Sequence, residues 1–124
     1  MTEAQHLEVA FRLNRLAEQL QSDGDDVAMA EMLWGTVNRI TNAIAIQHQL
    51  GDGTRLPRVG SVIHHLVRGH QVQLDLQHGV HAVGALHGHF YNSHLRPQDV
   101  EGHVVETQGF IANLLDLYDN HANQ

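Results

Sequence analysis

The sequence predicts an all-α protein: an antiparallel up-and-down bundle of about five helices that forms a single domain, residues 1–124. Three observations predict this fold. Apolar residues recur at a spacing near 3.6 through most of the chain. Turn-forming residues interrupt the pattern at 22–25 and 51–57. Short links between helices of similar length favour antiparallel neighbours in a bundle.

The first two helices are expected at 3–21 and 26–49. A turn at 22–25 separates them, and Asp25 is the candidate N-cap of the second helix. Both stretches carry an apolar face at helical spacing. In the first the face consists of Leu7, Ala10, Phe11, Ala17 and Leu20, and in the second of Val27, Ala30, Leu33, Trp34, Val37, Ile40 and Ile44.

The second half of the chain is expected to add three more helices. The first runs from about 58 to 70, and a link over 71–77 is predicted to be extended because its apolar residues alternate with polar ones. A fourth helix is expected at 79–94, and Pro97 suits the first turn of the last one. That last helix should bury Val100, Val104, Thr107, Ile111, Leu114 and Tyr118.

Composition excludes several classes of protein. The seven basic residues are all arginine, and fourteen acidic residues give a formal charge of −7, which disfavours a generic nucleic-acid surface. There is no apolar run long enough to cross a membrane, and the polar N-terminus lacks a signal-peptide pattern. Because cysteine is absent, a cytoplasmic location is the default expectation.

Histidine is the most unusual feature, with twelve residues in a chain of 124. Neutral imidazole is a common metal ligand, yet no two histidines lie four residues apart as a helical zinc site usually requires. Weaker metal patterns are Glu3-x-x-His6, half of a di-iron motif, and Asp75-x-x-His78-x-x-His81. A third hypothesis is convergence across two helices of three residues from the set His64, His65, His70, His87, His89 and His94. The sequence identifies no cofactor.

His87, Tyr91 and His94 form the main candidate ligand-binding site. They share one face of the predicted fourth helix, whereas His89 is expected to point away from that face. Two imidazoles and a phenol on a partly apolar face need polar partners if they are buried. Two interpretations therefore stay open: a polar network that fixes helix packing, or a small polar cleft that binds a ligand.

The C-terminal third resembles HEPN proteins (higher eukaryote and prokaryote nucleotide-binding domains), most closely their small stand-alone members. The pattern covers about residues 80–118 and ends in the amphipathic last helix. It consists of Ala82, Leu86, His87, Phe90, Tyr91, Leu95, Pro97 and Val100. The resemblance implies a helical bundle that is usually dimeric. It also implies a nucleotide ligand or a nucleotidyltransferase partner.

Many HEPN proteins are metal-independent ribonucleases, with an arginine followed after four to six residues by a histidine. Arg58 with His64 or His65, and Arg96 with His103, fit that spacing. The family motif normally has a polar residue directly after its arginine, where this chain has Val59 and Pro97. The resemblance therefore favours a non-catalytic binding or accessory module. The alternatives are an Arg/His ribonuclease of toxin type, with Arg58 and His64 as catalytic residues, and a histidine-ligated metal protein.

A homodimer is expected through the helices at 26–49 and 79–94, where small and apolar residues would permit close approach. These residues are Trp34, Gly35, Ala43, Gly84, Ala85 and Gly88.

Overall fold

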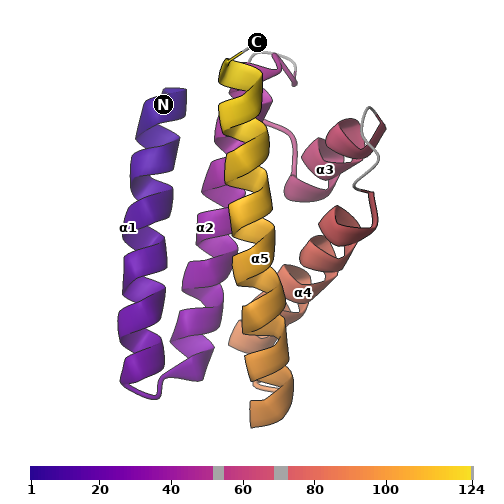
Figure 1. Cartoon of the computed structure of the whole chain (residues 1–124). Coiled ribbons are helices and arrows are strands. Elements are labelled where there is room, and N and C mark those ends of the chain that lie inside the picture. The colour runs from indigo at the N-terminus through magenta and orange to yellow at the C-terminus, as the bar shows by residue number, and fades with distance from the viewer. Residues whose placement is uncertain (52–54, 69–72, 124) are drawn as a thin grey trace.

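A computed structural model describes residues 1–51, 55–68 and 73–123. Within these ranges the chain forms five α-helices and no strand, so the predicted all-α bundle is confirmed (Figure 1). The helices are α1 (Glu3–Ser22), α2 (Asp26–Gln47), α3 (Val59–Arg68), α4 (Gln73–Asn92) and α5 (Pro97–Ala122).

Helix α2 is the centre of the bundle, because it packs against each of the other four helices. Helix α1 lies antiparallel to α2 on one side, while α3 and α4 lie on the other (Figure 1). Helix α5 packs along α2 and α4. The backbone of α1 approaches only that of α2, so α1 forms the outer edge of the bundle.

The starts of the first two helices are fixed by side chains that satisfy free backbone amides. Thr2 and Gln5 form a capping box on α1, in which each side-chain oxygen accepts a hydrogen bond from the other residue's backbone N–H. The Asp25 carboxylate accepts from the Ala28 N–H at 3.1 Å, which confirms Asp25 as the N-cap of α2. Gly24 makes the preceding turn at a φ of 80°.

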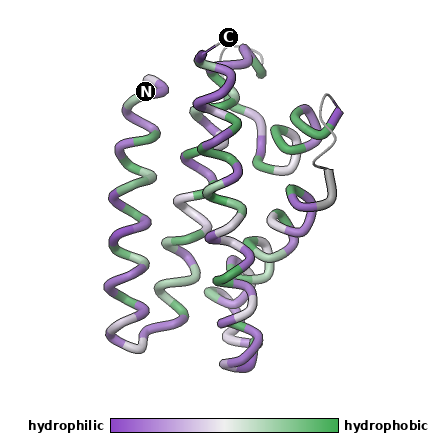
Figure 2. The backbone as a smooth tube through the Cα atoms, in the orientation of Figure 1, coloured by the Kyte–Doolittle hydropathy of each residue, from purple (hydrophilic) through white to green (hydrophobic). Residues whose placement is uncertain are grey.

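The core follows the apolar faces expected from the sequence, and α2 contributes more residues to it than any other helix. Phe11 is the exception, because it is 45% exposed and does not join the packed face of α1 as expected. Apolar segments dominate α2, whereas α1 alternates between hydrophilic and hydrophobic residues because only one of its faces packs (Figure 2). The largest fully buried apolar side chains are Phe110, Met29, Leu33, Ile40, Ile44, Leu76, Leu86 and Leu114.

The expected extended link over 71–77 is wrong for residues 73–77, which belong to α4. Residues 71 and 72 lie outside the described residues. The alternation of apolar and polar residues predicted an extended link wrongly. Among the described side chains of this stretch, only Leu76 enters the core. Leu76, Gly79, Val83 and Leu86 continue one buried row at helical spacing, and Gly79 lies directly against the Phe110 ring of α5. This contact between helices cannot be seen in the local sequence.

The end of α4 also differs from the expected one. The helix stops at Asn92, and Ser93 adopts a left-handed conformation with a φ of 47°. The Ser93 N–H still bonds to the His89 carbonyl at 2.7 Å, which closes the final turn. His94 therefore lies beyond the helix and not on the face that carries His87.

Three side-chain bonds connect segments that are far apart in the sequence. Gln47 donates to the Tyr118 carbonyl at 2.9 Å, and the Tyr118 hydroxyl donates to the Glu3 carboxylate at 3.2 Å. Gln108 donates to Asn14 at 3.5 Å. Burial, and then the nearby Glu3 carboxylate, raise the pKa of Tyr118. These bonds attach α5 to both α1 and α2.

His6 is buried between α1 and α2, where Arg39 Nη1 lies 3.3 Å from its Nδ1. The guanidinium can only donate, so Nδ1 accepts and the neutral ring carries its proton on Nε2. Burial, and then the positive charges of Arg39 and the N-terminus, lower the pKa of His6. Glu3 binds Tyr118 and His6 binds Arg39, so each member of the Glu3-x-x-His6 pattern already has a structural partner.

The lowered pKa of His6 predicts a loss of stability in acid. The folded state disfavours the His6 cation, so the unfolded chain binds the proton more readily once the pH falls below about 6.5. Stability should therefore decline as the pH falls through that value and level off below the folded-state pKa. We expect His6→Gln to show a smaller decline than the wild type between pH 7 and pH 5 in urea unfolding. Parallel curves for the two proteins would contradict this prediction.

Two residues of the predicted dimer interface are used inside the monomer. Ala43 is 0% exposed, and Gly35 faces Leu13 of α1, whose Cδ1 would lie 3.0 Å from an added Cβ. Gly84 remains exposed, with open space around it.

None of the described helices combines the length and apolar character that crossing a membrane requires.

Candidate functional site

A group of contacting acidic, imidazole and aromatic side chains lies where α2 passes α4. Helix α2 contributes Glu31 and Trp34, and helix α4 contributes His87 and Tyr91. The members of each pair are three or four residues apart, so they lie on one face of their helix. We call these four residues the Glu31–His87 site.

His87 contacts each of the other three residues of this site. Its Nδ1 lies 2.9 Å from Glu31 Oε2, and its ring stacks on Trp34 with centroids 4.4 Å apart and planes 20° apart. Tyr91 meets the same imidazole edge-on at 5.2 Å. The side chains of His87 and Glu31 are 34% and 23% exposed, so the pair is partly shielded but open to solvent.

The hydrogen bond to Glu31 fixes the chemistry of His87. A carboxylate can only accept, so Nδ1 carries the proton and Nε2 of the neutral ring is an acceptor. Protonation would turn Nε2 into a donor while the bond to Glu31 is kept. The site can therefore offer either an acceptor or a donor at Nε2, beside two aromatic rings. Tyr91 is 69% exposed and presents its ring to solvent.

The structure brings together two of the three predicted ligand-binding residues. His87 and Tyr91 are in contact, but His94 is exposed beyond α4 and its ring lies 6.0 Å from that of His89. The partners of His87 on α2, Glu31 and Trp34, were not predicted from the sequence. Glu31 is the only acidic residue of α2 after Asp26, and that isolated charge was the available signal.

His89 is not part of the site, although it neighbours His87 in sequence. It is 3% exposed, its Nε2 lies 3.3 Å from Asp26 Oδ2, and its Nδ1 accepts the Leu95 N–H at 3.1 Å. Because Nδ1 accepts a backbone N–H, the neutral ring carries its proton on Nε2 and donates it to Asp26. His89 thus joins the start of α2 to the segment after α4, which is a structural role.

The arginine–histidine pairs occupy two separate places. Arg58 and His64 are both exposed, at the start and on the outer surface of α3. Arg96 binds Asp99 through two contacts, at 2.9 and 3.4 Å, ahead of His103. This pairing raises the pKa of Arg96 and lowers that of Asp99, since each charge stabilises the other. The Arg96 guanidinium is therefore already occupied by a carboxylate.

The predicted metal sets do not assemble. Among residues 1–51, 55–68 and 73–123, no group of three histidine or acidic side chains has the geometry to hold a metal ion. His65 contacts His48, which is outside the proposed set, and His89 contacts His94, which belongs to its own half of that set. His70 lies outside the described residues. Since α4 begins at Gln73, Asp75, His78 and His81 do lie on one helix, all exposed.

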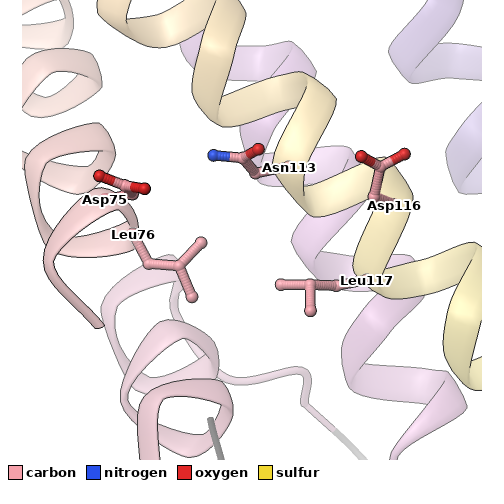
Figure 3. Close-up of a pocket in the computed structure, with 5 residues that line it drawn as sticks. All are labelled: Asp75, Leu76, Asn113, Asp116 and Leu117. Atoms are coloured by element: carbon pink, nitrogen blue, oxygen red, sulfur yellow. The ribbon is translucent and has the colours of Figure 1, made fainter. Parts of the chain in front are cut away.

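A surface pocket lies between α4 and α5, away from the Glu31–His87 site (Figure 3). Asp75 and Asp116 stand on its two sides with Asn113 between them, and Leu76 and Leu117 form its apolar part. Both carboxylates are exposed and would repel an anionic ligand. The pocket therefore suits a neutral or cationic ligand better than an anionic one.

No protein-family model matches the chain, and comparison with curated proteins and with solved structures gave no match either.

Proposed function

We propose that the protein is a non-catalytic binding module with a HEPN-like bundle, and that it binds the base of a nucleoside or nucleotide at the Glu31–His87 site. The observation that carries the proposal is the stacked Trp34–His87 pair beside the exposed Tyr91. Aromatic rings bind planar bases by stacking, at about 1–3 kcal/mol per base. The resemblance of the α4–α5 region to HEPN proteins supports the same ligand class.

Polar groups in the site suit a base better than a phosphate. Nε2 of His87 can accept from, or when protonated donate to, the edge of a base. The only permanent charge among the four residues is the Glu31 carboxylate, which repels phosphate. We therefore expect recognition of the nucleoside part, with little contribution from the phosphate.

The ribonuclease alternative has weaker support. Arg96 is paired with Asp99, and Val59 replaces the polar residue that normally follows the catalytic arginine. None of the arginine–histidine pairs includes a member of the Glu31–His87 site. A homodimer and a nucleotidyltransferase partner stay predictions of the resemblance. The surface of α4 that a second copy could use includes Gly84, Ala85 and the exposed ring of Phe90. The lack of cysteine favours a cytoplasmic setting.

The proposal predicts that nucleosides stabilise the wild type and that His87→Ala removes the effect. A ligand at 100 times its dissociation constant adds about 2.7 kcal/mol of stability. That is roughly 10 °C in the melting midpoint for a chain of this size. Thermal-shift measurements with the four ribonucleosides and their monophosphates test this. His78→Ala is the matched control, because His78 is exposed on the same helix and lies outside the site.

The competing interpretation gives a different result. If the four residues only fix helix packing, His87→Ala lowers stability by about 1–3 kcal/mol because Glu31 and Trp34 lose their partner. No compound would then move the wild-type midpoint. That outcome would reject the binding function, and so would equal ligand shifts in the wild type and in His87→Ala.

A further inference from the structure

A second histidine cluster lies where α2 and α5 end, apart from the Glu31–His87 site. His48 directly follows α2 as its C-cap, His65 lies on α3, and His121 is in the last turn of α5. His65 Nε2 lies 3.3 Å from His48 Nδ1, with the two rings nearly perpendicular. The His121 ring stacks on His48 with centroids 4.1 Å apart. Three separate helices thus bring their imidazoles together.

The spacing of the two nitrogens suits a shared metal ion. Zinc binds imidazole nitrogen at about 2.0–2.1 Å, so two nitrogens on one tetrahedral zinc are about 3.3–3.4 Å apart. The same spacing suits a hydrogen bond in which one ring donates to the other. A bound ion would take the place of the proton between the two rings, and the ring that donated this proton would carry its N–H on its other nitrogen, so both imidazoles stay neutral.

The position of the cluster also favours a cation. Helices α2 and α5 both end here, and the carbonyl ends of helices carry partial negative charge. His65 is exposed on α3 and His48 and His121 are partly exposed, so an ion can approach from solvent. The stacked His121 ring limits rotation of the His48 ring, which would hold its nitrogen toward His65.

We propose that His48 Nδ1 and His65 Nε2 form a two-histidine chelate for a divalent transition-metal ion, such as Zn²⁺, Ni²⁺ or Cu²⁺. Water molecules complete the coordination, and His121 orients His48. Imidazole selects these metals over Mg²⁺ and Ca²⁺, which prefer oxygen ligands. No group of three histidine or acidic side chains among the described residues can hold a metal ion. The proposed site uses only two protein ligands, so it agrees with that finding.

Calorimetric titration of the untagged full chain with Ni²⁺ or Zn²⁺ tests the proposal. His65→Ala should weaken the tightest binding step roughly 100-fold, since a prearranged pair of ligands becomes a single one. The matched control is His64→Ala, which removes the adjacent exposed histidine of the same helix and should bind as the wild type does. His87→Ala should also bind the metal normally, which separates this site from the nucleoside site.

A second measurement counts the bound imidazoles directly, so it does not depend on the stability of a variant. The electron paramagnetic resonance spectrum of one equivalent of Cu²⁺ should show two coupled imidazole nitrogens in the wild type and in His64→Ala, and one in His65→Ala. Circular dichroism confirms that each variant is folded. Failure of the wild type to bind any of the three ions, or equal losses in the His64 and His65 variants, would overturn the proposal.

Discussion

Replacing Gly79 with alanine should destabilise the protein by about 3 kcal/mol, at the upper end of the usual cost of overpacking a core. A Cβ at this position of α4 would collide with the ring of Phe110 and would also lie 2.6 Å from the Phe110 Cβ. Rotating the Phe110 ring cannot relieve the contact with its own Cβ, so α4 and α5 must move apart. This cost far exceeds the gain of about 1 kcal/mol that alanine normally brings to a helix.

Gly84 provides the matched control, five residues further along α4. An added Cβ there meets nothing within 4 Å, and the residue is exposed. Gly84→Ala should therefore stabilise the protein by about 0.4–1 kcal/mol. Urea unfolding followed by circular dichroism should give changes of opposite sign for the two variants. A stabilised Gly79→Ala would show that α4 and α5 do not pack as described.

Leu33→Ala is expected to cost about 2–5 kcal/mol, the range for removing a buried leucine side chain. Leu33 is 1% exposed on α2, the helix that packs against all of the others. The cavity it leaves would therefore weaken the centre of the bundle. A loss of that size is a large part of the 5–15 kcal/mol that holds a typical domain folded.

Leu16→Ala makes the same chemical change on the outer edge of the bundle. Leu16 lies on α1 and is 45% exposed, so its replacement should change stability by about 0.5 kcal/mol or less. The two midpoints measured in urea should differ clearly, with a similar slope for both variants. Equal effects of the two substitutions would contradict the central position of α2.

The helices themselves were predictable because their apolar faces repeat over many turns. The start of α4 was not, since the alternating residues before Gly79 do not show that Leu76 packs in the core as part of a helix. The end of α4 was misplaced for a local reason. Ser93 takes a left-handed conformation that its residue type does not signal, and this removes His94 from the face of His87.

Only the part of the candidate site that lies on one helix was predictable from the sequence. His87 and Tyr91 share a face of one helix, so their spacing revealed them. Glu31 and Trp34 come from another helix, and only the way α2 crosses α4 brings them to His87. Periodicity shows which face of each helix is buried, but it does not show which residues of two faces meet.

The position of α1 at the edge of the bundle has a consequence for the order of folding. Only the short turn at 23–25 separates α1 from α2, so this helical hairpin closes a small loop and loses little chain entropy. The bonds of Tyr118 to Gln47 and Glu3 join residues 71 and 115 positions apart. Because such distant contacts are costly to close, we expect the hairpin to form early and α5 to dock onto it late. The nucleus for folding would then lie in the half of the chain that precedes the candidate residues of α4.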